Sequence, residues 1–131
     1  MTFRETLDKH LRAIRERDLD ALAATLSADG AMVLVMSDGR LVRSAREFLD
    51  LHRDWFGSTS WTLDAEPMAL RESPDMAFAT LRLAYRDRTP EGKEIREASL
   101  LTLVFAREGD RWAMVLDQNT PIKDAPRPDA G

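Results

Sequence analysis

The sequence of 131 residues contains no cysteine, which excludes several kinds of chemistry at once. Without thiols there is no disulfide framework, no thiolate nucleophile and no cysteine-bound zinc or iron–sulfur centre. The absence of cysteine fits a reducing compartment, and the charged opening segment MTFRETLDKH gives no sign of a signal peptide. We therefore expect a soluble, cytoplasmic protein.

Long apolar runs, basic clusters and nucleotide-binding motifs are missing as well. No apolar run approaches the ~20 residues of a membrane-spanning helix, so no membrane association is expected. The formal net charge of −4 argues against a nucleic-acid partner. The sequence has no G-x-G-x-x-G or P-loop motif, no G-x-S-x-G motif and no H-x-x-x-H spacing. We expect neither a cofactor nor a metal ion.

The first part of the chain is predicted to be helical. Apolar residues recur at the spacing of one helix face, at Phe3, Leu7, Leu11 and Ile14. His10 lies on this same face. Asp18 is a typical N-cap for a second, short helix. Ser44 and Glu47 match the capping box of a third helix, which Gly57 ends.

The rest of the chain is predicted to form strands. A short apolar strand is expected at 31–36, and turn sequences after Gly57 separate four long strands at 59–72, 75–88, 94–107 and 110–119. Apolar and mixed positions alternate along the long strands, so one face of the sheet needs helices to cover it. We predict an α+β fold in which three N-terminal helices pack on a cone-shaped, curved antiparallel sheet with a cavity at its wide end.

One domain is expected to span residues 1–122. The remaining segment, 123–131, has a polar, proline-containing sequence and is expected to be a flexible tail.

Two segments resemble a known family. The segment RDLDALAATLSADGAMV, with its acidic cap, short helix and turn into a strand, resembles the opening of SnoaL-like, ketosteroid-isomerase-like proteins of the nuclear transport factor 2-like superfamily. The ending LLTLVFAREGDRWAMVLDQNTP is closer to the SgcJ/EcaC-type subgroup. The resemblance covers roughly residues 3–122 and implies the cystatin-like cone fold. It does not imply one reaction, because this fold hosts isomerases, cyclases, hydrolases, dehydratases and non-catalytic binding domains.

The resemblance also tests one reaction residue by residue. Steroid isomerases place a tyrosine acid on the first helix, and His10 occupies that position here. Their two catalytic aspartates, on the first and penultimate strands, correspond to Leu34 and Leu101. Loss of a positioned proton-transfer group costs a rate factor on the order of 10²–10⁴. The resemblance therefore argues against steroid-isomerase chemistry.

The expected cavity lining is apolar with few polar groups. The resemblance places Ser99 and Leu101 toward the cavity, and period-2 alternation along 110–119 places Gln118 there with Met114 and Leu116. Trp55 and Trp61 near the rim, and Tyr85 as a further polar point of the lining, complete the expected ligand-binding set. Such a lining suits a small hydrophobic ligand.

Two residues are candidates for catalysis, and both have a simpler structural interpretation. His10 on an apolar helix face is also what a core histidine would look like. Alternation turns Asp117 and Asn119 to the outer face, so a catalytic Asp117 requires a bulge or a twist at the strand end. His52, four residues after Phe48, is more simply a packing residue.

The outer sheet face is predicted to be too apolar for solvent, with Phe78, Thr80, Leu100, Thr102, Val104 and Val115 on it. A patch of this kind predicts an interface, and a two-fold homodimer through the sheets would cover it. Two functions are consistent with the sequence. One is a pocket protein that binds a small hydrophobic or polyketide-like molecule, with weak isomerase-, cyclase- or hydrolase-type acid–base activity. The other is a non-catalytic dimerisation or accessory module.

Overall fold

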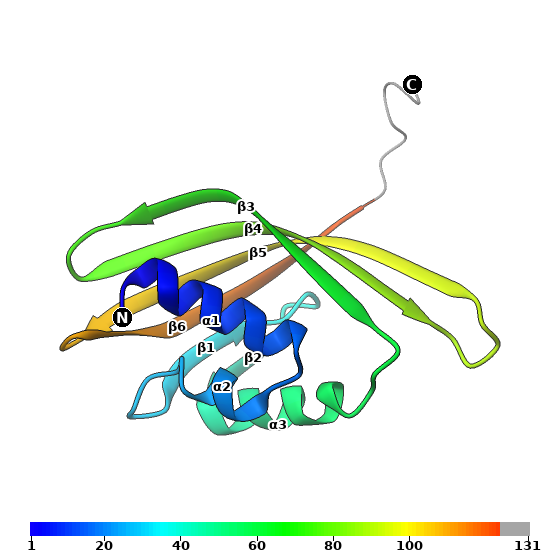
Figure 1. The fold of residues 1–131 in the computed structure, drawn as a ribbon, viewed down its shortest axis with the longest axis horizontal. Coiled ribbons are helices and arrows are strands. Elements are labelled where there is room, and N and C mark those ends of the chain that lie inside the picture. Colours follow the sequence, from blue (N-terminus) through cyan, green and yellow to red (C-terminus); the bar gives the residue numbers. More distant parts are fainter. Residues whose placement is uncertain (124–131) are drawn as a thin grey trace.

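In the computed structural model, residues 1–123 are described and form one mixed sheet with helices on one side (Figure 1). The strands are β1 (Ala31–Val35), β2 (Leu41–Ser44), β3 (Thr62–Glu72), β4 (Met76–Arg88), β5 (Glu94–Glu108) and β6 (Arg111–Ile122). Their order in the sheet is β2-β1-β6-β5-β4-β3. Neighbouring strands are antiparallel except β1 and β6, which run parallel. The tail expected at 123–131 lies, apart from Lys123, outside the described residues.

The helices of the described part are α1 (Phe3–Arg15), α2 (Leu19–Ala23) and α3 (Ala45–Phe56). Side-chain caps explain where each begins. Thr2 and Glu5 form a capping box at α1, and Asp18 accepts a hydrogen bond from the Ala21 N–H at 3.0 Å at α2. Ser44 caps α3 by accepting the Glu47 N–H at 3.2 Å. None of these helices has the length and apolarity needed to cross a bilayer.

The α+β fold predicted from the sequence is confirmed. Each of the four long strands begins and ends within three residues of its predicted limits. The short strand β2 was not predicted. The last strand runs past its predicted end at 119, so that Pro121 lies within β6 opposite Ser99. A proline is tolerated there because β1 pairs with β6 only as far as Gln118, which leaves the following edge of β6 open.

A β-bulge in β6 decides which side chains face the cavity. Val104 pairs with Leu116 and Phe105 pairs with Met114, so Val115 is an extra residue on β6. A bulge shifts the alternation of the strand by one residue. Met114 is therefore buried, as predicted, but three residues later Asp117 is buried as well. The facing predicted from the sequence is correct before the bulge and reversed after it.

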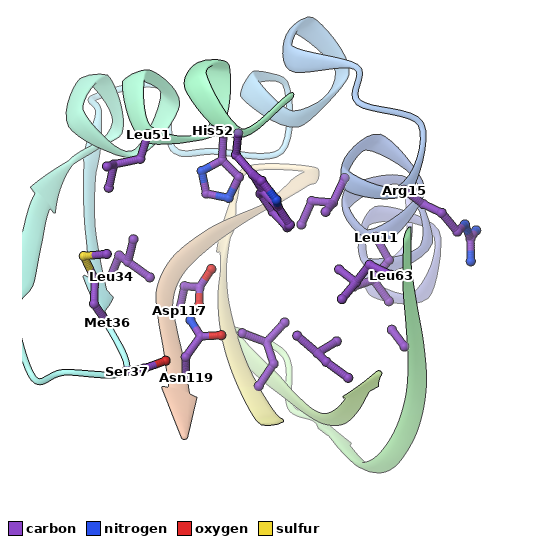
Figure 2. Close-up of a pocket in the computed structure, with 15 residues that line it drawn as sticks. Leu11, Arg15, Leu34, Met36, Ser37, Leu51, His52, Leu63, Asp117 and Asn119 are labelled. Atoms are coloured by element: carbon purple, nitrogen blue, oxygen red, sulfur yellow. Dashed lines mark hydrogen bonds between the residues drawn. The ribbon is translucent and has the colours of Figure 1, made fainter. Parts of the chain in front are cut away.

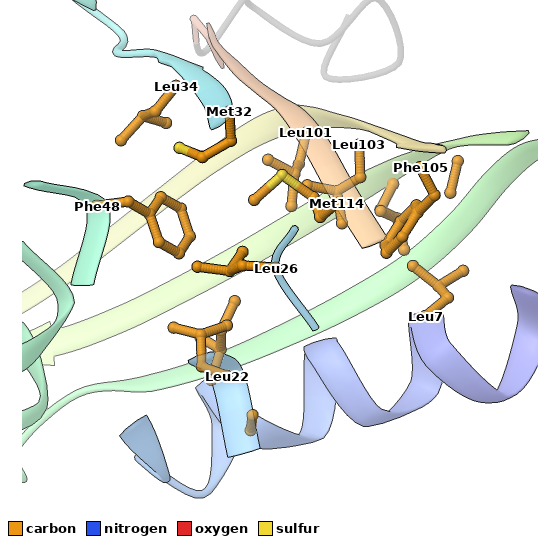
Figure 3. Close-up of a cluster of buried hydrophobic side chains, with 14 of the residues drawn as sticks. Leu7, Leu22, Leu26, Met32, Leu34, Phe48, Leu101, Leu103, Phe105 and Met114 are labelled. Atoms are coloured by element: carbon orange, nitrogen blue, oxygen red, sulfur yellow. The ribbon is translucent and has the colours of Figure 1, made fainter. Parts of the chain in front are cut away.

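The core fills the end of the sheet near the start of α1. Phe3 packs edge-to-face against Phe105 and Trp112, with ring centroids 5.3 and 5.8 Å apart. Side chains from helices and strands continue this core toward the middle of the molecule, as Leu7, Leu22, Phe48 and Met114 do in Figure 3. The far end, near the last turns of α1 and α3, is less completely filled, and the candidate site lies there.

Candidate functional site

A cavity of about 450 Å³ lies between the ends of α1 and α3 and the curved sheet (Figure 2). Its apolar wall comes from α1, β3, β4 and β5 and consists of Leu11, Ile14, Leu63, Ala65, Leu83 and Leu101. Its polar groups come mainly from α3, β6 and the turn after β1, and they include Ser37, His52, Asp117 and Asn119; the apolar residues Leu34, Met36 and Leu51 lie among them. This volume is within the ~300–1,000 Å³ range of small-molecule sites. The cavity therefore has a hydrocarbon wall on one side and hydrogen-bonding groups both on the helix α3 and on the strand β6.

A second chamber of about 290 Å³ continues this space along the sheet. The two chambers share lining residues, among them Trp55, Leu83 and Asn119. The outer chamber adds more polar groups, including Tyr85 and Ser99. The inner chamber is thus mainly apolar, and polarity increases toward the outer one.

Asp117 is the principal titratable group of the inner chamber. Its side chain is 5% exposed, and it lies beside Leu34 where β6 pairs with β1. Burial raises the pKa of Asp117 to about 7, although a hydrogen bond from Asn119 Nδ2 to Asp117 Oδ1, at 3.0 Å, acts in the opposite direction. A carboxyl group in this state can donate or accept a proton near neutral pH.

The structure supplies the bulge that a cavity-facing Asp117 requires. Asn119, also expected on the outer face, likewise lines the cavity. The prediction that Gln118 faces the cavity is wrong, because Gln118 is exposed and pairs with Thr102 on the outer face. Leu116 faces outward for the same reason, since it follows the extra residue Val115.

His52 of α3 is a cavity residue that sequence reasoning assigned to packing. Its Nδ1 donates a hydrogen bond to the Phe48 carbonyl at 2.7 Å, since a carbonyl oxygen only accepts. Burial lowers the pKa of His52, and the bond to Phe48 opposes this only in part. The ring is therefore neutral near pH 7, with its proton on Nδ1. The i, i+4 spacing of Phe48 and His52 was visible in the sequence, but the direction of the ring was not.

His10 does not lie where the resemblance implied. Its side chain is fully buried, at 0% exposed. Among the described residues that line the two chambers, His10 does not occur. Nδ1 of His10 donates to Thr25 Oγ1 at 2.7 Å, because the Thr25 hydroxyl donates in turn to the Leu22 carbonyl. Burial lowers the pKa of His10 to about 3, with a smaller contribution from nearby His52. His10 is therefore a neutral core residue. It does not line the cavity, so the structure does not place it where it could contact a ligand.

The aromatic residues divide between wall and support. Trp55 lines both chambers and Tyr85 lines the outer one. Trp61, expected to contact ligand, is instead 1% exposed and stacks behind Trp55, with ring centroids 4.2 Å apart. Its indole N–H donates to the Trp55 carbonyl at 3.1 Å, and the Arg17 guanidinium lies 4.1 Å from its ring centroid. Trp61 therefore holds Trp55 in place.

The remaining predicted lining residues lie where they were expected. Leu101 contributes to the inner chamber and Ser99 to the outer one. Among residues 1–123, no three His, Asp or Glu side chains come together in a way that could hold a metal ion.

Helices on one side of a curved sheet, with a cavity at one end, define the class of cone-shaped α+β proteins. The family model for the SnoaL-like domain matches residues 4–118, so the chain belongs to the SnoaL-like family. A comparison with curated proteins gave no match. Membership of the SgcJ/EcaC-type subgroup stays a prediction.

Solved structures with the same fold carry diverse names. A domain from Thiobacillus denitrificans, named for the calcium/calmodulin-dependent protein kinase type II association domain, is 21% identical with a TM-score of 0.78, covering 93% of this chain and 96% of its own. A ketosteroid isomerase-like protein from Erwinia carotovora atroseptica is 15% identical with a TM-score of 0.76, covering 92% and 93%.

A third structure, from Streptomyces avermitilis, is provisionally named a dehydratase of the NTF2-like family. It is 14% identical with a TM-score of 0.76, covering 91% of this chain and 93% of its own. At these identities the likenesses show the fold alone, which is the nuclear transport factor 2-like, cystatin-like fold.

Proposed function

We propose that this protein binds a small, mainly hydrophobic molecule in its cavity and carries out acid–base chemistry on it through Asp117. The observation that carries the proposal is a buried carboxyl group in the cavity wall whose pKa is raised to about 7. A buried titratable group in an apolar pocket is a common mark of a catalytic acid or base. The finding that two of the solved structures bear isomerase-like or dehydratase names agrees with proton-transfer chemistry in this fold.

The shape and polarity of the cavity support a class of ligand. One side is hydrocarbon, and the opposite side offers the carboxyl group of Asp117 and the amide of Asn119 (Figure 2). A ligand with an apolar ring face and an oxygen-bearing edge would satisfy both sides. Polyketide-like aromatic compounds have this character, and a hydroxylated end would fit the outer chamber near Ser99 and Tyr85.

A pair of neighbouring substitutions tests the binding proposal. Asn119→Leu alters the cavity wall, whereas Gln118→Leu alters the outer face of the same strand. A ligand at 100 times its Kd stabilises the folded state by about 2.7 kcal/mol. In a thermal-shift screen of naphthols and hydroxyanthraquinones, we expect at least one compound to raise Tm, with the gain reduced in Asn119→Leu and kept in Gln118→Leu. Equal loss in both variants, or no compound that raises Tm, would contradict ligand binding in this cavity.

The alternative function, a non-catalytic dimerisation or accessory module, is favoured by the outer face of the sheet. Phe78 and Leu100 are 38% and 37% exposed there, and Val104 and Leu116 continue the row that begins at Phe78 across β5 and β6. An association domain is also the name of one solved structure with this fold. We infer a homodimer through this face, which is compatible with either function, and a cytoplasmic location.

Charge placed on the outer face tests the homodimer. Leu100→Lys introduces a cation on the outer face, next to Arg82 of β4, and Leu41→Lys introduces one at a comparably exposed apolar residue on β2. We expect Leu100→Lys to convert the dimer to monomer at micromolar concentration, as measured by analytical ultracentrifugation, and Leu41→Lys to leave it dimeric. A parent protein that sediments as a monomer would rule out this interface.

A further inference from the structure

The direction of the His52 ring gives the cavity a second group that can transfer a proton. Nδ1 of His52 carries the proton that it donates to Phe48, so Nε2 of the neutral ring holds the free lone pair. Within the described residues, Nε2 of His10 is buried without a hydrogen-bond partner. Nε2 of His52 is not a buried atom of this kind. His52 lines the inner chamber, and Figure 2 shows its ring pointing into that chamber.

The position of this ring is fixed by its neighbours. His52 stacks on Phe48 with ring centroids 4.1 Å apart, and it meets Trp55 and Phe56 edge-to-face at 5.7 and 5.8 Å. These contacts and the bond to the Phe48 carbonyl leave one orientation and one tautomer. A group held in this way is pre-organised for proton transfer.

Asp117 faces the same space from the sheet, on the side of the chamber away from α3. His52 enters from α3 and Asp117 from β6, and Figure 2 shows the two side chains turned toward one another. Oδ1 of Asp117 accepts the hydrogen bond from Asn119, which leaves Oδ2 to carry the acid proton. The cavity thus offers a proton donor and a lone pair on two facing sides.

We propose that His52 is a second catalytic residue and works with Asp117 as an acid–base pair across the bound ligand. The proposal rests on the proposed function, since it requires the ligand to occupy the inner chamber. Asp117 Oδ2 gives its proton to an oxygen of the ligand, while Nε2 of His52 takes a proton from a C–H or O–H bond of the same ligand. The electron pair of that bond stays on the ligand, whose net charge is unchanged.

The pair returns to its starting state by one further proton transfer. After the ligand has gained one proton and lost another, Asp117 is a carboxylate and His52 an imidazolium. The proton on Nε2 then passes to Oδ2, directly or through a water molecule in the emptied cavity. No oxidant, reductant or cofactor takes part. Reactions of this class move a proton from one position of a neutral ligand to another.

This arrangement supplies what the steroid-isomerase positions lack. Leucine occupies both of those positions here, at Leu34 and Leu101, and both leucines line the inner chamber. Leu34 pairs with Asp117 across β1 and β6, so the carboxyl group comes from the neighbouring strand. The second group comes from a helix. The proton-transfer chemistry is therefore assigned to residues different from those that the resemblance implied.

Other titratable groups lie near Asp117 and His52. Arg15 and His10 are on α1, Tyr85 on β4 and Glu97 on β5. His10 interacts electrostatically with His52 but lies outside the cavity wall that the described residues form. The other three are at the rim or in the outer chamber. Asp117 is the acidic group that shares the inner chamber with His52.

Nuclear magnetic resonance titration of the ligand-free protein tests the pair. The signals are those of the Asp117 carboxyl carbon and the His52 ring nitrogens, followed from pH 4 to 9. Because the ionised forms attract each other, both signals should show the same two midpoints in the parent protein. In Asp117→Asn and in His52→Gln the remaining group should show one midpoint that lies between those two. We expect a displacement on the order of one pH unit.

Independent titration would overturn the proposal. In that case each group has a single midpoint, and substitution of the other group leaves it unchanged. This result would not affect ligand binding, because the thermal-shift screen measures binding separately. Conversely, a coupled titration together with a failed ligand screen would confirm that the two groups interact electrostatically but would overturn the proposed function and, with it, their catalytic role.

Discussion

Replacing Asp117 with asparagine is expected to raise the free energy of unfolding at pH 8 by up to about 4 kcal/mol. Burial raises the pKa of Asp117 from an ordinary 3.8 to about 7 in the folded protein, and each pKa unit corresponds to ~1.4 kcal/mol. Below pH 3.8 the carboxyl group is protonated in both states and costs nothing. Between pH 3.8 and 7 the unfolded chain releases the proton first, so stability falls as pH rises, and above pH 7 the loss is complete.

Asparagine has nearly the same shape and does not ionise, so it escapes this loss. Its side-chain oxygen can still accept the hydrogen bond from Asn119, which Asp117 Oδ1 accepts in the parent protein. Urea unfolding at pH 4 and pH 8 measures the effect, and the gain should be present at pH 8 and nearly absent at pH 4. Asp64→Asn, at an exposed position of β3, is the matched control and should change little at either pH. Equal stability of the parent and Asp117→Asn at pH 8 would show that the carboxyl group is not buried.

Such a gain would itself indicate function. A protein that keeps a buried, destabilising carboxyl group in a cavity gives up stability for chemistry at that group. We therefore expect Asp117→Asn to be more stable and to keep the fold, but to lack the acid group needed for the proposed chemistry.

Replacing His10 with leucine is expected to remove a contribution of about 3 kcal/mol by which acid destabilises the folded protein. Burial lowers the pKa of His10 from 6.5 to about 3 in the folded protein. The unfolded chain therefore takes up a proton below pH 6.5 while the folded protein does not, and stability falls as pH decreases toward 3. Between pH 6.5 and 4 this loss amounts to about 3 kcal/mol in the parent protein, and leucine cannot contribute to it.

The measurement is the difference in unfolding free energy between His10→Leu and the parent protein at pH 6.5 and pH 4. We expect the difference to move by about 3 kcal/mol in favour of the variant at pH 4. Thr25→Val is the control, because it removes the hydroxyl that His10 contacts at 2.7 Å but keeps the buried ring. It should lower stability by about 1–2 kcal/mol at both pH values and leave the pH dependence unchanged. Identical pH dependence in His10→Leu and the parent would mean that folded His10 takes up protons freely.

Asp117 and His10 have opposite effects over the same range of pH. From pH 4 to 6.5, each contributes a slope of ~1.4 kcal/mol per pH unit, downward with rising pH for Asp117 and upward for His10. These slopes offset each other in the parent protein. In Asp117→Asn the slope from His10 remains, together with that of His52, whose pKa is also lowered by burial. The variant should therefore show a steeper loss of stability on acidification than the parent.

The sequence was sufficient for the cavity walls that precede the bulge. Alternation along β5 and the resemblance together placed Leu101 and Ser99 on the cavity side, and both line the cavity. The outward facing of Phe78 and Leu100 was predicted in the same way. These predictions succeed because consecutive side chains on an unbroken strand point to opposite faces, whatever the rest of the molecule does.

The sequence was not sufficient for the residues that follow Val115. The extra residue arises from the pairing between β5 and β6, and no turn sequence or glycine in β6 indicates it. Strict alternation therefore predicted that Gln118 faces inward and Asp117 outward, which is the reverse of how they face in the structure. The polar cluster at the end of the chain was recognised, but its two faces were exchanged.

The two histidines show the same limit on helices. Periodicity placed His10 on the buried face of α1 and His52 beside Phe48, and both placements are correct. Which one meets the cavity depends on what lies opposite. Thr25 and Phe105 enclose His10, whereas the space before His52 is left open by the curvature of the sheet.

By itself, the sequence determined the order of the helices and of the strands other than β2, the caps of the helices and the facing of the regular strands, because these depend on residues close together in the chain. The tertiary structure alone decided that Asp117 is buried, that His10 is enclosed and that His52 faces the cavity. Burial sums contacts from several elements, and a β-bulge belongs to two strands at once. The chemistry proposed for this protein depends on both, so it became visible only when the strands and helices were in place.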